Sequence, residues 1–231
     1  MTRFRLSHTA GAAALALVAS TAFALSLASL SNTDATKGVK TALEKGATVA
    51  VAELGKQNGF LNNDKVRIEL PGILDKAMPL LRMTGQGKKL DELQVSMNHA
   101  AESAVAMAKP LLLDAVRNMS VTDAKNILTG GDTSVTDFFR AKTAAPLGKQ
   151  FLPIVKNITD KNGLSPKYNA VVDKVGHSVH VPDEQKTVES YVTQRALDGL
   201  YVMIGEEEKA IRKDPVGTGS AILSKVFGAV K

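Results

Sequence analysis

Apolar residues recur every three or four positions along most of the chain, a spacing that gathers side chains on one face of an α-helix. The longest such pattern runs from Leu90 to Asn118, where leucine, methionine and alanine alternate with polar residues. Alanine on the apolar face lets a second helix approach closely, so this segment is predicted to be the central packing helix. Pro110 lies inside the pattern and predicts a kink or a break there.

The same spacing predicts further helices, whose ends are marked by capping residues and turn formers. Ser31 precedes the first of them, and Ser120 and Asp123 have the spacing of a capping box. Pro146 and Pro153 are expected to divide the long helical pattern in which they lie. The predicted helices besides the central one span residues 31–54, 71–83, 120–129, 133–163, 165–175, 187–213 and 220–230.

One stretch has the alternation of a β-strand instead. Val66, Ile68 and Leu70 would share one face of a strand, and turn-forming residues precede them. Residues 178–181 could form a second strand beside them. The predicted fold class is therefore all-α: a single irregular helical bundle of about seven or eight helices, in which one short two-stranded β-ribbon is allowed.

The first 24 residues have the composition of an export signal. Two arginines precede an almost wholly small and apolar run, which ends in the small-x-small pattern Ala22-Phe23-Ala24 that signal peptidase recognises. The run is shorter than the ~20 residues of a membrane span, and an uncleaved N-terminal anchor is the alternative. We predict a cleaved signal peptide, residues 1–24, and one soluble helical domain, residues 25–231. A periplasmic location and no transmembrane segment after cleavage follow from this prediction.

The net charge, the aromatic content and the absence of cysteine limit which kinds of molecule the protein is expected to bind. The formal net charge is +6 for the chain and +4 without the predicted signal, which removes Arg3 and Arg5. Aromatic residues are few and scattered, so no platform for nucleic acid is expected. An anionic envelope surface is the better partner for any basic patch, and a well-mixed positive surface is the alternative. The absence of cysteine excludes disulfides, thiolate metal sites and a lipoprotein anchor.

The most highly charged run of the chain lies between Ile204 and Pro215. Successive helical residues are about 100° apart, so its three consecutive glutamates cannot form one cluster. Glu207 is predicted to lie in the middle of the apolar stripe, where a carboxylate needs a partner or becomes protonated. Glu206 is expected to be solvated, and Glu208, at the edge of the stripe, to pair with Arg212 four residues later.

Glu207, Glu208 and Arg212 are therefore the candidate binding residues. A structural ion pair that ties the helix to another segment is the competing interpretation of Glu207. A third possibility is that the helix extends past the core and leaves Glu207 exposed. No catalytic residue, metal site or cofactor is predicted.

Other features are weaker indications of chemistry. His177 and His180 have acidic neighbours, but their spacing differs from that of helical zinc sites, and no metal ligation is expected. His99 and Glu102, three residues apart, are expected to form a surface pair.

Two apolar features each have two interpretations. The side chains of Phe138, Phe139, Phe151 and Leu152 could line a lipid cavity or fill the core. The apolar face of residues 220–230 could contact a membrane or a partner, although we favour a helix that closes the bundle.

The chain contains three characteristic blocks, which are NGFLNNDKVRIELP, MSVTDAKNILTGGDTS and SYVTQRALDGLYVMIGEEEKAIR. Their sequence and order resemble an exported bacterial family, domain of unknown function 4197. The resemblance extends from about Gly38 to the final KVFGAVK and leaves out Gly176 to Lys186. It implies an export signal and a mostly helical fold, and it implies no activity and no site residues.

These observations favour a non-catalytic envelope protein that binds an apolar small molecule or another envelope component. A periplasmic, hydrolase-like enzyme built around a buried Glu207 is the alternative from another class. A structural or stress-related envelope protein without a ligand is the third. Ligand binding would require a continuous apolar cavity of at least ~300 Å³, and catalysis would require Glu207 in a pocket with a second polar group.

Overall fold

The computed structural model describes residues 31–72, 78–83, 85, 87–131, 133–161, 163, 165–166, 168–169, 182 and 185–228. No β-strand occurs in these ranges, and the predicted all-α helical bundle is confirmed. The helices are α2 (Asn32–Gly55), α3 (Met78–Met83), α4 (Gly87–Val105), α5 (Lys109–Arg117), α6 (Val121–Thr129), α7 (Ser134–Lys161), α9 (Val188–Lys213) and α10 (Ala221–Gly228).

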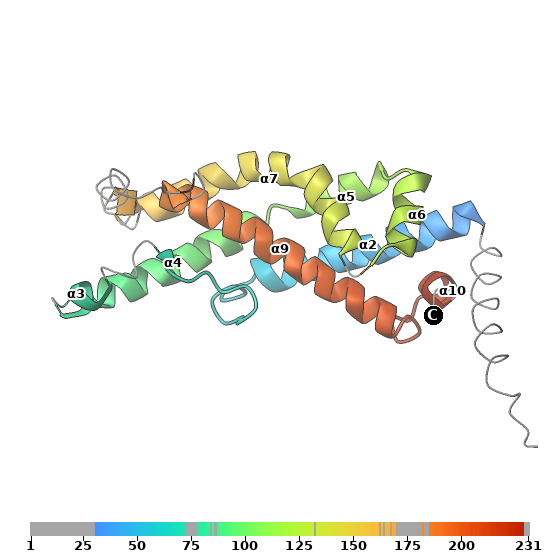
Figure 1. Ribbon diagram of the computed structural model, residues 1–231, viewed down its shortest axis with the longest axis horizontal. Helices are drawn as coiled ribbons and strands as arrows, with labels where there is room; N and C mark the ends of the chain where they lie inside the picture. Colours follow the sequence, from blue (N-terminus) through green and yellow to red (C-terminus); the bar gives the residue numbers. More distant parts are fainter. Residues whose placement is uncertain are drawn as a thin grey trace, which may run out of the picture.

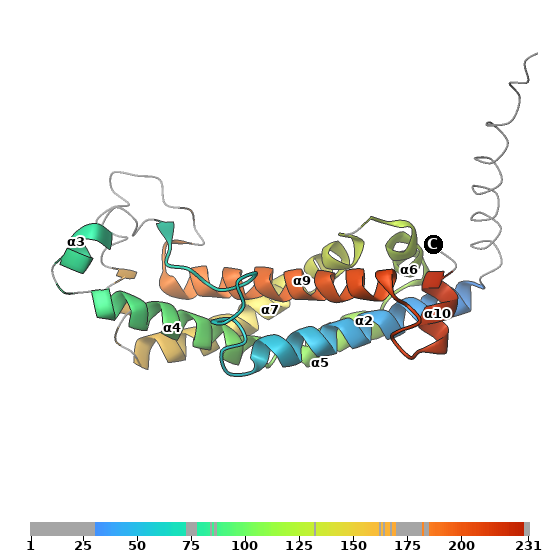
Figure 2. The ribbon, with the colours of Figure 1, turned by 90° about the horizontal axis from the view of Figure 1, so that it is seen from below.

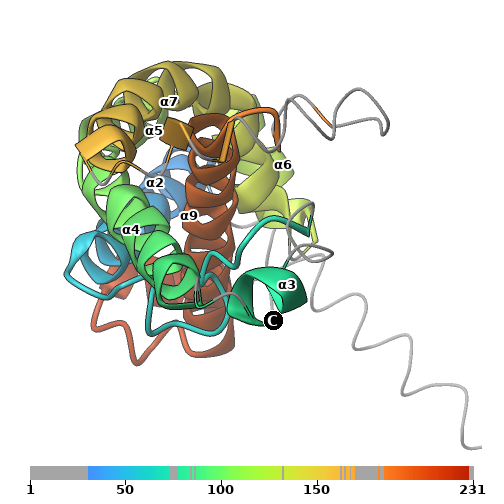
Figure 3. The ribbon, with the colours of Figure 1, turned by 90° about the vertical axis from the view of Figure 1, so that its left-hand side faces the viewer.

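Helices α7 and α9 are long and run side by side in opposite directions (Figure 1). Helices α2 and α4 lie end to end along them, α4 against the beginning of α9 and α2 against its later part (Figure 2). Helices α5 and α6 contact both α2 and α7, and α10 packs on α2. Seen end-on, α4, α7 and α9 surround a shared interior (Figure 3), through which one connected cluster of buried apolar side chains extends.

Capping side chains fix the starts of three helices where the sequence predicts them. Ser31 and Thr187 each accept a hydrogen bond from the backbone N–H of the third residue of their helix, at 3.0 and 3.1 Å. Ser120 and Asp123 form a reciprocal capping box at the start of α6. Each cap satisfies N–H groups that have no partner within the helix.

The predicted central helix is broken near Pro110, as expected. Helix α4 ends at Val105 and α5 begins at Lys109, so Pro110 lies in the first turn of α5, where its missing N–H costs no intrahelical hydrogen bond. The alanine stripe does face the interior, because four of its members are completely buried: Ala100, Ala101, Ala104 and Ala108.

The prediction that Pro146 and Pro153 divide the next long helix is wrong. Helix α7 is continuous from Ser134 to Lys161 and contains both prolines, which are exposed. Each proline removes one intrahelical hydrogen bond, and α7 changes direction along its length without ending (Figure 1). Large buried side chains hold the helix to its neighbours on both sides of the prolines, namely Phe139, Leu147, Phe151 and Val155.

Residues 66–70, predicted as a strand, form no β-ladder with any segment that the structure describes. The side-chain amide of Asn98 in α4 pairs with Ile68 instead. It donates to the Ile68 carbonyl and accepts from the Ile68 N–H, both at 2.9 Å. A buried side chain thus takes the place of a partner strand. Outside the described residues lie 1–24, 73–77, most of 165–175, the second predicted strand 178–181, and His177 and His180.

Helix α10 closes one end of the bundle against α2. A Cβ atom on Gly38 of α2 would come within 2.5 Å of Val226, so glycine is needed for this approach. Lys225 donates a hydrogen bond to Asp34 at 2.7 Å across the same contact. This is the bundle-closing role favoured for the C-terminal segment.

Candidate functional site

The three consecutive glutamates of α9 have three different surroundings. Glu206 is partly exposed and forms ion pairs with Lys65 and Lys209. The hydrogen bond from Lys65 is the main reason why the pKa of Glu206 is lowered, and Lys209 adds to it. Glu206 therefore joins the loop after α2 to α9 at the surface.

Glu207 does not lie in the middle of the buried face, and that prediction is wrong. Its side chain is half-buried beside α2, where a Cβ atom on Gly46 would lie 3.4 Å from Glu207 Cβ. Burial raises the pKa of Glu207, and the charge of Lys45 partly offsets this. The Glu207 carboxylate therefore lies at the edge of the buried surface of α9, not in its core.

Most of the apolar side of α9 is buried, including Leu197, Leu200, Ile204 and Ile211. Near the three glutamates, Met203 and Glu207 are half-buried, whereas Glu208 is buried. Helix α9 packs against α2, α4 and α7 together, and the positions of these neighbours determine which side of the helix is covered.

Glu208 is the buried acid of this run, with 5 % of its surface exposed. Arg212 donates from Nε to Glu208 Oε1 at 2.7 Å, and from Nη2 to the carbonyl of Ile127 in α6, also at 2.7 Å. The same guanidinium lies 5.4 Å from the ring centre of Phe227 in α10. The predicted pair is present, but it is buried and links α9 to α6 and α10. The structure therefore brings Glu208 and Arg212 together and leaves Glu207 apart from them.

A second buried carboxylate, Glu102 of α4, was expected at the surface as the partner of His99. It is 5 % exposed, and its oxygens accept hydrogen bonds from the backbone N–H groups of Asn58 and Phe60 at 3.1 Å and of Leu61 at 3.3 Å. The partly exposed His99 lies beside this buried carboxylate. Its Nε2 is 4.0 Å from Glu102 Oε2 and 3.1 Å from Asn58 Oδ1. Glu102 thus holds the loop after α2 in place, and no local spacing in the sequence indicates it.

The loop held by Glu102 has little freedom to change shape. Asn58 adopts a left-handed backbone, with φ of 60°. A Cβ atom on Gly59 would overlap the carbonyl oxygen of Glu53, and one on Gly199 of α9 would lie 2.7 Å from the Phe60 ring. These glycines allow the loop and its buried phenylalanine to sit directly against two helices.

A small cavity of about 10 Å³, enough for roughly one water, lies in the core between α2, α6, α7, α9 and α10, with Glu208 in its wall. Two open hollows on the surface are far larger. One of 670 Å³ is lined by charged and amide side chains of residues 53–65 together with Met203.

The other hollow is a groove of 560 Å³ between α7 and α9. Its α7 wall is formed partly by small residues, namely Ala144, Ala145 and Gly148. A Cβ atom on Gly148 would contact only Leu197 Cδ1, at 3.8 Å. Leu152, one of the residues considered for a lipid cavity, is 42 % exposed and lines this groove. The three phenylalanines considered with it, Phe138, Phe139 and Phe151, are buried in the core.

Polar groups lie at defined points of the groove. Arg140, at one end, is paired with Asp198 at 3.2 Å and lies 5.3 Å from the centre of the Tyr201 ring. Lys149 lines the groove and forms no ion pair with a described residue. Thr193 also lines it, is only 8 % exposed, and its Oγ1 has no hydrogen-bond partner among the described residues.

The hydroxyl of Thr193 differs from those of the buried threonines in α7, although the buried hydroxyl of Ser165 likewise has no partner among the described residues. Buried threonines of α7 donate to the carbonyl one turn earlier, Thr143 at 2.6 Å and Thr159 at 3.0 Å. A buried hydroxyl without such a bond costs free energy, but because the Thr193 oxygen is itself buried, it is not presented to the open groove. The groove therefore combines apolar side chains with the ammonium group of Lys149.

The described residues form an all-α bundle with a small core cavity and two open hollows on its surface. The family model described as "Protein of unknown function (DUF4197)" matches residues 29–228, and the chain belongs to this family. Comparison with curated proteins and with solved structures found no match.

The described residues lack two further features. No helix among them is long and apolar enough to cross a membrane. They also contain no group of three or more histidine, aspartate and glutamate side chains arranged to hold a metal ion.

Proposed function

We propose that this protein is an exported, non-catalytic binding protein that takes an apolar or amphiphilic small molecule into the groove between α7 and α9. The observation that carries the proposal is the 560 Å³ groove itself, which is lined by apolar side chains such as Leu152 and Leu197 and by Lys149. The core cavity of about 10 Å³ is too small for a ligand of this size. An apolar ligand body against Leu152 and Leu197, with an acidic group near Lys149, would match both kinds of surface.

The buried carboxylates support a binding role over a hydrolytic one. Glu102 is engaged by three backbone N–H groups and Glu208 by Arg212, so both contribute to holding segments together. Glu207 is not among the residues that line the core cavity or either surface hollow. The arrangement that the enzyme hypothesis requires, Glu207 in a pocket with a second polar group, is not found there.

A groove-filling variant tests the site. Gly148→Leu places a side chain in the open groove without a backbone clash, and Gly228→Leu, at an exposed helical glycine with open space around it, is the matched control. With dansylaminoundecanoic acid as the fluorescent probe, we expect Gly148→Leu to weaken binding at least ~10-fold, because the groove volume is lost. The control should bind as the wild type does. Absence of probe binding to the wild type, or equal binding to both variants, would contradict the proposal.

Export has its own test. Expression of residues 1–231 in a bacterial host, followed by intact-mass measurement of the periplasmic fraction, should show a chain beginning at Leu25. Native mass spectrometry of the same material would reveal a retained ligand as additional mass lost on denaturation. A full-length chain that stays in the cytoplasm would contradict the export part of the proposal.

A further inference from the structure

Helix α7 contains a repeat of seven residues on its exposed side. Lys142, Lys149 and Lys156 occupy equivalent positions, and Pro146 and Pro153 follow the first two lysines by four residues each. All five residues are exposed. Seven residues make almost two full turns and advance the helix by about 10.5 Å, so the three lysines form a row about 21 Å long.

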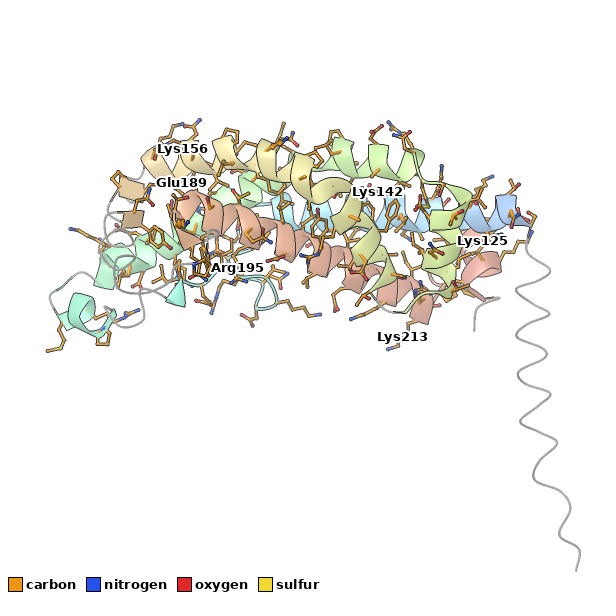
Figure 4. All side chains as sticks on the ribbon, turned by 45° about the horizontal axis from the view of Figure 1, so that its top comes forward. Lys125, Lys142, Lys156, Glu189, Arg195 and Lys213 are labelled. Carbon is orange, nitrogen blue, oxygen red and sulfur yellow. The ribbon has the colours of Figure 1, made fainter. Side chains whose placement is uncertain are left out.

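The lysine row is accessible from outside the bundle. Figures 1 and 3 show α7 at the edge of the molecule. Figure 4 labels Lys142 and Lys156, which lie well apart along this one helix.

The charges of α7 between its two aspartates, Asp137 and Asp160, are all positive. The 22 residues from Phe138 to Thr159 contain three lysines, one arginine and no carboxylate. Two of these cations have acidic partners outside the segment, since Arg140 pairs with Asp198 and Lys156 with Asp160. Lys142 and Lys149 form no ion pair with any described residue, although the charge of Lys142 is near enough to Asp123 to help lower the pKa of that carboxyl. Lys149 is the cation of the row that has no acidic partner among the described residues.

Apolar surface lies between the lysines. Leu152 is 42 % exposed, and Ala145, Pro146 and Pro153 are exposed beside it. Cations alternating with exposed apolar groups, in a helix without exposed aromatic residues, match a lipid interface better than a nucleic acid. Because proline has no N–H, the carbonyls of Lys142 and Lys149 lack their usual helical donor and need water or a headgroup donor. The row is thus suited to the headgroup layer of a bilayer rather than to its hydrocarbon core.

We propose that the row of Lys142, Lys149 and Lys156 docks the protein onto an anionic phospholipid surface, with Leu152 entering the headgroup layer. The three ammonium groups attract the lipid phosphates, and the exposed apolar groups add contact area. This proposal goes beyond ligand binding and does not depend on it. The two are compatible, because Lys149 and Leu152 also line the groove, whose opening would then adjoin the lipid surface.

Vesicle co-sedimentation tests the docking surface. The variant Lys142→Gln/Lys149→Gln/Lys156→Gln is compared with Lys37→Gln/Lys88→Gln/Lys89→Gln, which removes the same charge from exposed lysines of α2 and α4. On vesicles of equal parts phosphatidylglycerol and phosphatidylcholine at low salt, we expect the first variant to bind about 100-fold more weakly than the wild type. The control should lose less than about threefold, and Leu152→Ser about threefold to tenfold. Circular dichroism should show that all the variants keep the helix content of the wild type.

Several results would overturn the proposal. One is equal loss of binding in the two triple variants, which would indicate a response to net charge alone. Others are no binding of the wild type to the anionic vesicles, or equal binding to vesicles of phosphatidylcholine only. Gly148→Leu should bind the vesicles at least as tightly as the wild type, because it keeps the three lysines and adds an apolar side chain beside Lys149. A failure of docking and a failure of the groove site can therefore be told apart.

Discussion

Glu102 and Glu208 are equally buried, yet different groups stabilise them. Glu102 receives three backbone N–H groups of the loop after α2, whereas Glu208 receives the guanidinium of Arg212 from its own helix. The first carboxylate shapes a loop that contains a left-handed asparagine, and the second, through Arg212, joins three helices. A buried carboxylate in this fold can thus be stabilised by backbone N–H groups or by an opposite charge. The loss of stability on substitution should differ between the two cases.

The largest effect is expected at Glu102. Glu102→Ala would leave three backbone N–H groups without their acceptor, and we expect the free energy of unfolding to fall by about 4 kcal/mol. Urea denaturation would measure the loss, with Glu53→Ala, an exposed glutamate on α2, as the control. A loss below about 1 kcal/mol would show that water replaces the carboxylate easily.

The pair of Glu208 and Arg212 should respond differently to single and double substitution. Arg212→Met leaves the buried carboxylate without its guanidinium and should cost about 3 kcal/mol. Glu208→Met/Arg212→Met removes both charges and should cost less than the single change, because no uncompensated buried charge remains. A double variant that is less stable than Arg212→Met would show that the pair itself stabilises the fold.

Thr193 supplies the opposite case, a buried polar group without a partner in the described part of the fold. Thr193→Val removes the unsatisfied hydroxyl at nearly constant volume and should raise the stability of the ligand-free protein by about 1 kcal/mol. Thermal unfolding would detect the increase. A decrease would mean that a water or another partner already satisfies the hydroxyl.

Like Glu102, Asp123 is stabilised mainly by hydrogen bonds rather than by an opposite charge, but it lies at the surface. Its carboxylate accepts hydrogen bonds from the backbone N–H and the hydroxyl of Ser120. These hydrogen bonds lower the pKa of Asp123 in the folded protein. Its contribution to stability is therefore present above the unfolded-state pKa and is lost as the pH falls through the folded-state pKa. We expect Asp123→Ala to cost about 1 kcal/mol at neutral pH and much less in acid, as urea titrations at several pH values would show.

Glu207 is expected to give the smallest effect. Its pKa is raised by burial, so its contribution to stability is present below the unfolded-state pKa and is lost as the pH rises through the folded-state pKa. Glu207→Gln removes this dependence, and at neutral pH it should change stability by less than about 0.5 kcal/mol, with a slight gain. A loss of about 3 kcal/mol or more would instead support the interpretation of Glu207 as a member of a buried ion pair.

Local patterns were sufficient for much of this fold. The caps at Ser31 and Ser120, the break near Pro110 and the pairing of Glu208 with Arg212 all depend on residues within one or two helical turns. Helical period and capping chemistry act over that range, so the sequence alone predicted them.

The features that could not be predicted depend on distant contacts. Glu102 meets N–H groups 41 to 44 residues earlier in the chain, and Asn98 pairs with Ile68, 30 residues earlier. The identity of the buried glutamate in α9 depends on how three neighbouring helices cover it, and the continuity of α7 depends on packing along its length. The groove is likewise made by two helices, so the position of Thr193 along α9 could not indicate it.

The contact between α10 and α2 has a consequence for the timing of folding. Lys225 and Asp34 are 191 residues apart in the chain, and Val226 covers Gly38 from the same distant segment. During synthesis this contact can form only after α10 has been made, and contacts of such long range form slowly. For a chain that we propose to be exported, the delay would favour a translocation-competent state until α10 has emerged.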